Sequence, residues 1–120
     1  AMRGESIKQA AVKGQVFDAI VNATPLGLNP NDGSPLKAAE LNSRVVMDMI
    51  YTPMRTPFIQ LAERRGIQTV SGVEMFLAQG IAQWEIWMGE RAPAEIMRKV
   101  VLAHLSRQEK RNASRGRQKS

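Results

Sequence analysis

The stretch RVVMDMIY, residues 44–51, decides the fold of this chain. It is an almost unbroken apolar run, and a loop that contains Pro53 follows it directly. Such runs are typical of a strand that is buried on both faces of a parallel sheet. Asp48 interrupts the run with a charge, which requires a hydrogen-bonding partner if the strand is buried. We therefore interpret Asp48 as a structural residue.

Two further strands are predicted on either side of this one. FDAIVNAT, residues 17–24, precedes it, and IQTV, residues 67–70, follows it. A helix is expected before the third strand, because Thr56 is a suitable cap and Pro57 suits the first helical position. Gly66 then ends that helix as a left-handed cap. Strands that alternate with helices in this way predict a parallel α/β sheet.

Helical segments account for most of the remaining chain. Ser71 and Glu74 have the spacing of a capping box, and a helix from there to about residue 88 should end at Gly89. Pro93 opens a last helix. Weaker helical turns are expected at residues 6–13 and 36–41.

The long helix that ends at Gly89 carries two tryptophans. Trp84 and Trp87 recur at helical spacing with the other apolar residues of this segment. We expect both indoles to pack against the core and not to stack on a ligand.

The fold class that follows is α/β, a partial Rossmann-like three-layer domain with about three parallel strands flanked by helices. Residues 1–106 would form the second half of such a domain, with upstream elements missing. Because the strand at residues 17–24 then lacks its other neighbour, its open edge should recruit a second copy of the chain. We expect a homo-oligomer.

Charge and composition limit the function classes. The chain has 120 residues, 43% of them hydrophobic, no cysteine and a net charge of +6. Almost all of that charge lies at residues 107–120, where six basic residues face Glu109 alone. We predict that this segment is a basic disordered tail, and we do not expect it to bind nucleic acid because it contains no aromatic residue. The lack of cysteine agrees with a cytoplasmic setting, and no apolar run is long enough to span a membrane.

Three motifs, in this order and at these spacings, carry a family resemblance. They are NATPLG at residues 22–27, DMIYTP at residues 48–53, and SGVEMFLAQG at residues 71–80. Together they resemble the end of the nucleotide-binding domain of shikimate dehydrogenases. The resemblance extends from about Phe17 to about Leu105.

This resemblance implies an activity, the reduction of 3-dehydroshikimate to shikimate with NADPH, within the shikimate pathway of aromatic amino acid biosynthesis. In the family, a substrate domain supplies a catalytic Lys and Asp, and a glycine-rich loop binds the NADP phosphates. The sequence contains no G-x-G-x-x-G motif and nothing that matches the catalytic pair. We therefore expect no catalytic residue in this chain, no activity of the isolated chain, and a partnership with the missing N-terminal part.

Five residues match functional positions of the family. The resemblance makes Tyr51 and Gln79 contacts of the substrate, shikimate or 3-dehydroshikimate. It places Thr24, Met49 and Gly72 beside the cofactor, the last two at the nicotinamide. Each residue also has an alternative interpretation without a ligand: a tyrosine packed at a strand end, a solvated helix glutamine, a turn threonine, a core methionine and a glycine near a helix cap.

Other chemistry finds little support. His104 is the single histidine and stands in no motif, so we interpret it as structural or solvated. The carboxylates lack metal-ligand spacing, and we expect no metal site. Asn22 should hold the turn after its strand by local hydrogen bonds.

Several alternatives remain open at this point. The chain could be a non-enzymatic remnant that binds a partner or regulates, with its basic tail on nucleic acid, or it could be a relative that uses quinate. The sequence does not distinguish NADP from NAD. It also leaves open a fusion to a dehydroquinate dehydratase.

Overall fold

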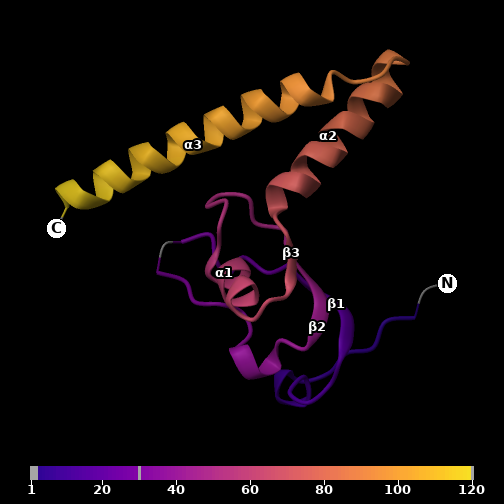
Figure 1. The fold of residues 1–120 in the computed structure, drawn as a ribbon, viewed down its shortest axis with the longest axis vertical. Helices are drawn as coiled ribbons and strands as arrows, with labels where there is room; N and C mark the ends of the chain where they lie inside the picture. The colour runs from indigo at the N-terminus through magenta and orange to yellow at the C-terminus, as the bar shows by residue number, and fades with distance from the viewer. Residues whose placement is uncertain (1–2, 30, 120) are drawn as a thin grey trace.

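The computed structural model of the chain describes residues 3–29 and 31–119. Two short 3-10 turns, Gln9–Ala11 and Ala38–Glu40, accompany the main elements. The strands and helices in chain order are β1 (Phe17–Asn22), β2 (Ser43–Asp48), α1 (Pro57–Arg64), β3 (Gln68–Val70), α2 (Gly72–Met88) and α3 (Ala94–Gln118). Figure 1 shows a small sheet unit, from which α2 and α3 project as a helical hairpin.

The three strands form one parallel sheet in the order β1-β2-β3. Val21 is level with Met47, which is level with Val70 in the third strand. The carboxyl ends of the strands therefore lie at the same edge of the sheet. The expected parallel α/β fold is confirmed.

One face of the sheet packs against α1. Val46 and Leu41 are fully buried there, together with Phe58 and Ala62 of the helix. The helix begins as the sequence predicts, because the Thr56 side chain accepts a hydrogen bond from the Ile59 amide and Pro57 occupies the first turn.

The opposite face of the sheet carries apolar side chains as well. Since side chains alternate along a strand, Val21 and Met47 point away from the face that packs on α1. Val21 is 50% exposed. This strand therefore presents apolar surface outside the core.

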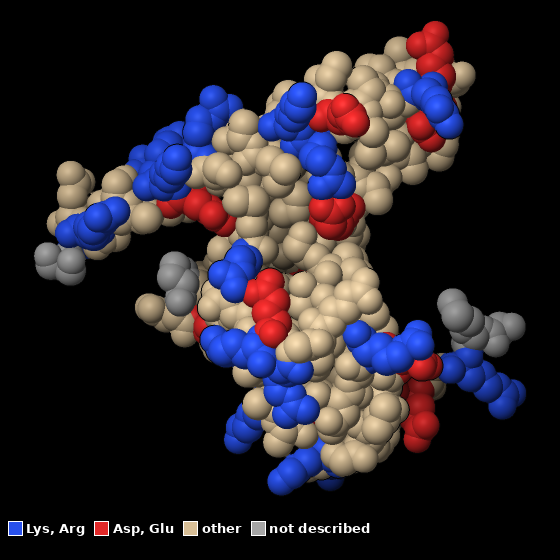
Figure 2. Space-filling model, viewed as in Figure 1, with Lys and Arg blue, Asp and Glu red and all other residues tan. Residues whose placement is uncertain are grey.

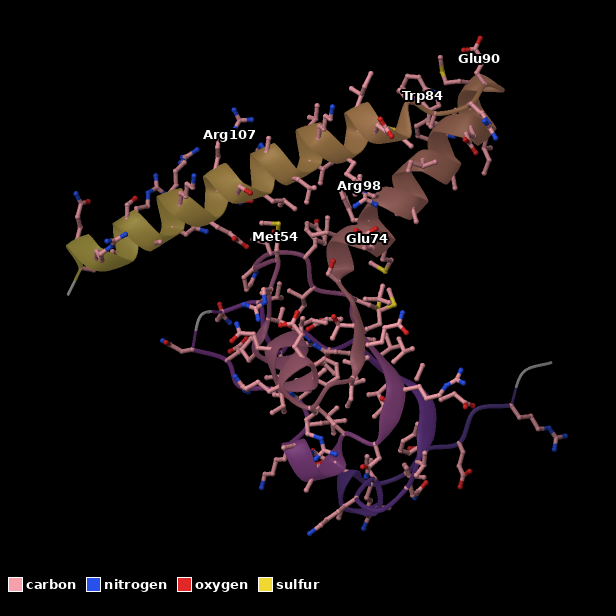
Figure 3. All side chains as sticks on the ribbon, in the orientation of Figure 1. Met54, Glu74, Trp84, Glu90, Arg98 and Arg107 are labelled. Carbon is pink, nitrogen blue, oxygen red and sulfur yellow. The ribbon has the colours of Figure 1, made fainter. Side chains whose placement is uncertain are left out.

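The base of the helical hairpin has its own small core. Val73 and Leu77 of α2 pack with Leu105 of α3, and Met54 from the loop after β2 lies against them. Figure 3 shows Met54 beneath α3, and Glu74 and Arg98 pointing toward one another between the two helices. The Met54 amide also donates a hydrogen bond of 2.7 Å to Glu109 Oε1, which joins α3 to the loop.

The prediction of a disordered tail at residues 107–120 is wrong for the part that the structure describes. Helix α3 continues without a break to Gln118, while Ser120 lies outside the described residues. The segment contains Arg, Lys, Gln, Glu and Ala, which favour helix, and no proline. An existing helix also propagates at much lower cost than a new one is nucleated.

Three smaller expectations also need correction. The Ser71 side chain makes no capping hydrogen bond, and the Glu74 side chain pairs with Arg98 and does not reach back to the Ser71 backbone. Residues 6–13 form only the turn Gln9–Ala11. Trp84 and Trp87 are 39% and 74% exposed, because the far end of the hairpin extends beyond the sheet.

None of the helices in the described part of the chain is long and apolar enough to cross a membrane.

Candidate functional site

A pocket of about 280 Å³ opens at the carboxyl ends of β1 and β2. In parallel α/β sheets this edge is where ligands bind. The residues that line it come from the two segments that follow these strands: Ala23, Thr24, Pro25, Leu28, Met49, Ile50, Tyr51 and Thr52. Three of the five predicted site residues, Thr24, Met49 and Tyr51, therefore lie around one pocket.

A buried polar network holds the two strand ends together below this pocket. Asp48 is fully buried, and its Oδ1 accepts hydrogen bonds from Asn22 Nδ2 at 3.1 Å and from the Ile50 amide at 3.0 Å. Its Oδ2 accepts a hydrogen bond of 2.6 Å from the Thr56 hydroxyl. The structural interpretation of Asp48 is therefore confirmed.

Asn22 extends the same network to the first turn. Its Oδ1 accepts hydrogen bonds from the Thr24 amide at 3.0 Å and from the Thr24 hydroxyl at 2.6 Å, and its Nδ2 donates to the Leu26 carbonyl at 3.0 Å. The predicted role of Asn22 in the turn is confirmed. The contact with Asp48 was not predicted, since it joins residues 26 positions apart.

Gly72 lies directly behind the pocket, at the first residue of α2. A Cβ atom at this position would meet the Ile50 carbonyl oxygen at 2.4 Å and the Met49 carbonyl oxygen at 2.8 Å. The absence of a side chain therefore lets the amino end of α2 approach the backbone that carries Met49. The structure thus places the two residues expected at the nicotinamide side by side, and gives Gly72 a packing role of its own.

Tyr51 also borders a second, larger pocket. Its ring stacks on Phe76 of α2, with ring centroids 4.8 Å apart and an interplanar angle of 28°. This pocket of about 560 Å³ lies between that ring pair and α3. Sequence reasoning missed Phe76, although it stands four residues beyond Gly72 and thus one helical turn further along α2.

Gln79 lies apart from both pockets. It is exposed on α2, and its Nε2 donates a hydrogen bond of 3.2 Å to the Phe76 carbonyl. At 1.5 Å per residue, it stands about 10 Å along the helix from Gly72. Its amide group thus projects from the same helix that begins behind the first pocket.

The chemistry available at the first pocket is binding and orientation. The side chains that line it offer hydroxyl and apolar groups, and none of them is a carboxylate, an imidazole or an amine. Two carboxyls elsewhere in the chain have a lowered pKa: Asp32, chiefly through hydrogen bonds from the Gly27 and Asn29 amides, and Glu74, chiefly through its hydrogen bonds from Arg98. Of the residues that line this pocket, Tyr51 alone belongs to the types that commonly transfer protons in catalysis.

The pocket fits one end of a nicotinamide cofactor. Met49 and the small residues Ala23 and Thr24 offer a largely apolar wall for a planar ring, and Thr24 adds a hydroxyl. A pyrophosphate would need a glycine-rich turn at a helix amino terminus. The described residues contain no such turn beside this pocket.

The fold and this pocket define a class: the second half of a doubly wound α/β nucleotide-binding domain, with a ligand crevice at the strand ends. The family model described as "Shikimate 5'-dehydrogenase C-terminal domain" matches residues 72–102. These residues cover α2 and the first part of α3.

Curated proteins and solved structures agree with this match. The chain is 45% identical over 91 residues to the "Shikimate dehydrogenase (NADP(+))" of Methanopyrus kandleri, covering 73% of this chain and 31% of that protein. A shikimate 5-dehydrogenase from Listeria monocytogenes, solved with shikimate and NAD, superposes with a TM-score of 0.68 at 27% identity, covering 78% of this chain and 34% of the other. A quinate dehydrogenase from Corynebacterium glutamicum, solved with NAD, gives a TM-score of 0.69 at 25% identity, covering 79% of this chain and 33% of the other.

The chain spans about a third of the length of the curated relatives that it matches. It is similar in sequence and in fold to the C-terminal part of NADP-dependent shikimate dehydrogenases. The family resemblance of the three sequence motifs is thereby confirmed.

Proposed function

We propose that this chain is the C-terminal part of an NADP-dependent shikimate dehydrogenase and forms one wall of its active site. The observation that carries this proposal is the grouping of Thr24, Met49 and Tyr51 around one pocket at the strand ends, with Gly72 directly behind it. Shikimate or 3-dehydroshikimate is the substrate, and the missing N-terminal part is the partner that completes the site.

Each residue has a role that fits its position. Met49 and Thr24 hold the nicotinamide ring against the strand ends, and Gly72 keeps the backbone close to it. Tyr51 and Gln79 donate and accept hydrogen bonds with substrate hydroxyls. The cofactor, when bound, supplies the hydride. Proton transfer is assigned to groups outside this chain, since the pocket is lined by no carboxylate, imidazole or amine.

A chimera tests the proposal. The matching C-terminal part of the Methanopyrus kandleri enzyme is replaced by residues 17–120 of this chain, and NADPH consumption with 3-dehydroshikimate is followed. We expect the chimera to turn over, and the chain alone to show no turnover. An inactive chimera that is folded, by its cooperative melting, contradicts the proposal, and so does an active isolated chain.

Variants in the chimera test the substrate contact. Gln79→Ala should lower kcat/KM by about tenfold, because an unmet substrate hydrogen bond costs about 1 kcal/mol or more. Gln83→Ala is the matched control, since Gln83 is also exposed on α2 and lies one turn further along. Equal losses of kcat/KM in the two variants would show that Gln79 does not contact the substrate.

Quinate is the alternative substrate with a specific observation behind it, since a quinate dehydrogenase shares this fold with a TM-score of 0.69. The same chimera assayed with quinate and with shikimate gives the ratio of the two kcat/KM values. We expect shikimate to be preferred. A higher kcat/KM for quinate than for shikimate would instead assign this chain to a quinate dehydrogenase.

A further inference from the structure

The C-terminal half of α3 has a positively charged face. His104, Arg107, Gln108, Arg111, Asn112 and Arg115 line one open groove of about 320 Å³ along the helix. The three arginines are four residues apart, so their side chains stand on one side of the helix at intervals of about 6 Å. We call Arg107, Arg111 and Arg115 the arginine face. Figure 2 shows blue side chains gathered along this helix, and Figure 3 shows Arg107 projecting from it.

The arginine face has no acidic counterpart among the described residues. Glu109 is the single acidic residue between Ile96 and Lys119, and its carboxylate is held by the Met54 amide at 2.7 Å. Neither the Arg55–Glu63 salt bridge nor the Arg98–Glu74 salt bridge involves any of the three arginines. The face therefore presents three uncompensated charges to solvent.

The groove continues into an aromatic pocket. His104, Arg107 and Gln108 line both the arginine groove and the 560 Å³ pocket beside it. In that second pocket Tyr51, which is 38% exposed, stacks on Phe76. The fold thus brings a stacked ring from the loop after β2 next to the basic helix, a combination that the basic segment itself lacks.

We propose that this groove binds single-stranded nucleic acid without sequence preference. Successive backbone phosphates lie on the arginine face, and a base enters the adjoining pocket beside the ring of Tyr51. Arginines that follow the phosphates, together with an aromatic ring that accepts any base, are the recurring means of binding single strands. The sequence argued against such a partner because residues 107–120 contain no aromatic residue, and the structure supplies that ring from elsewhere in the chain.

The measurement is fluorescence anisotropy of a labelled oligo(dT) of about twelve nucleotides, a length within the usual site size of such grooves. It uses all 120 residues of this chain and a series of salt concentrations from about 50 to 200 mM, where counterion release is measurable. We expect binding that weakens as salt rises. No binding at the lowest salt would overturn the proposal.

Two triple variants with the same change in net charge locate the site. Arg107→Gln/Arg111→Gln/Arg115→Gln should reduce affinity at least tenfold and flatten the log–log salt slope by about 2, which is about 0.7 for each of three phosphate contacts. The control is Arg44→Gln/Arg64→Gln/Arg65→Gln, which alters exposed arginines away from α3 and should change affinity less than about twofold. Equal losses would show attraction to net charge and would overturn the proposal.

Variants of the ring distinguish a nucleic acid from other polyanions. Tyr51→Ala should lower affinity for oligo(dT) by about fivefold or more, while Tyr51→Phe keeps the ring and should change it little. Heparin and a DNA duplex serve as competitors without unpaired bases. If Tyr51→Ala has no effect, or if heparin or the duplex binds more tightly than the single strand, the groove is a general anion site and the proposal fails.

Discussion

At the scale of the residue, the site depends on a buried carboxylate that is satisfied without a positive charge. Asp48 has three donors: an amide side chain, a backbone N–H and a hydroxyl. These donors come from three separate segments, so they connect β1, β2 and the start of α1. Because a buried charge that loses a partner is costly, this network fixes how the strand ends meet below the pocket.

The Thr56 hydroxyl is the point at which the network can be tested. It donates to Asp48 Oδ2 and accepts from the Ile59 amide, and the residue is fully buried. Thr56→Val keeps the shape but removes both bonds, so we expect the free energy of unfolding to fall by about 2 kcal/mol. Thr56→Ser keeps the hydroxyl and should cost less than about 1 kcal/mol. Urea unfolding measures both, and equal losses would show that packing of the methyl group matters more than the bonds.

At the scale of the element, the amino end of α2 is positioned by backbone contact. Gly72→Ala would place a Cβ 2.4 Å from the Ile50 carbonyl oxygen and 2.6 Å from its carbonyl carbon, and neither atom can rotate away. We expect a loss of about 2 kcal/mol in stability, the usual cost of overpacking.

Gly80 in the middle of the same helix gives the matched control. A Cβ there would meet only Met97 Cε at 3.7 Å, which is ordinary contact. Gly80→Ala should therefore stabilise the chain by about 0.5 kcal/mol through helix propensity. Thermal melting of both variants measures the two stability changes. A Gly72→Ala variant as stable as the wild-type chain would show that α2 can shift away from the strand end.

The pairing of α2 with α3 predicts a pH dependence. The Arg98 guanidinium lowers the pKa of the Glu74 carboxyl below its usual 4.5. Since the folded-state pKa is depressed, the stabilisation is complete above the unfolded pKa and is lost as pH falls through the folded pKa. The pair is half exposed, so we expect Glu74→Gln to cost only about 0.5 kcal/mol at neutral pH and nothing well below pH 4. Glu95→Gln on α3 is the control. If the stability difference between the wild-type chain and Glu74→Gln persists well below pH 4, the pairing is contradicted.

The elements also show how far sequence reasoning reaches. Thr56, Pro57, Gly66 and Gly89 mark their helix ends correctly, because caps and left-handed glycines act within a few residues. The capping box predicted at Ser71 and Glu74 does not form: the Ser71 side chain makes no capping hydrogen bond, and the Glu74 carboxylate accepts from Arg98, 24 residues away.

Contacts between distant segments account for the other differences. Three of the predicted site residues could be placed at one pocket from strand ends and family motifs alone. The Asn22–Asp48 bond, the Tyr51–Phe76 stack and the approach of α3 to Tyr51 depend on tertiary contact. The sequence carries no local signal for them.

At the scale of the whole molecule, the sheet has more apolar surface than its helices cover. β1 is an outer strand, and Val21 on the face away from α1 is 50% exposed. A parallel sheet of this class is ordinarily covered on both faces, and an open edge recruits further chain. In the proposed enzyme the N-terminal part would cover this surface, so the chain alone should cover it with a second copy.

Self-association of the isolated chain should therefore depend on β1. We expect the mass measured by light scattering to rise with concentration beyond that of the 13.3 kDa chain. Val21→Lys places a charge on the strand and should shift the equilibrium to the monomer, because lysine on an edge strand blocks pairing. Val16→Lys is the control, since Val16 is 84% exposed just before β1 and contributes no strand surface.

If both variants remain associated, the contact lies elsewhere, with the exposed Trp87 of the helical hairpin as the next surface to vary. A wild-type chain that stays monomeric at high concentration would show that the open strand is tolerated, and the predicted homo-oligomer would be wrong.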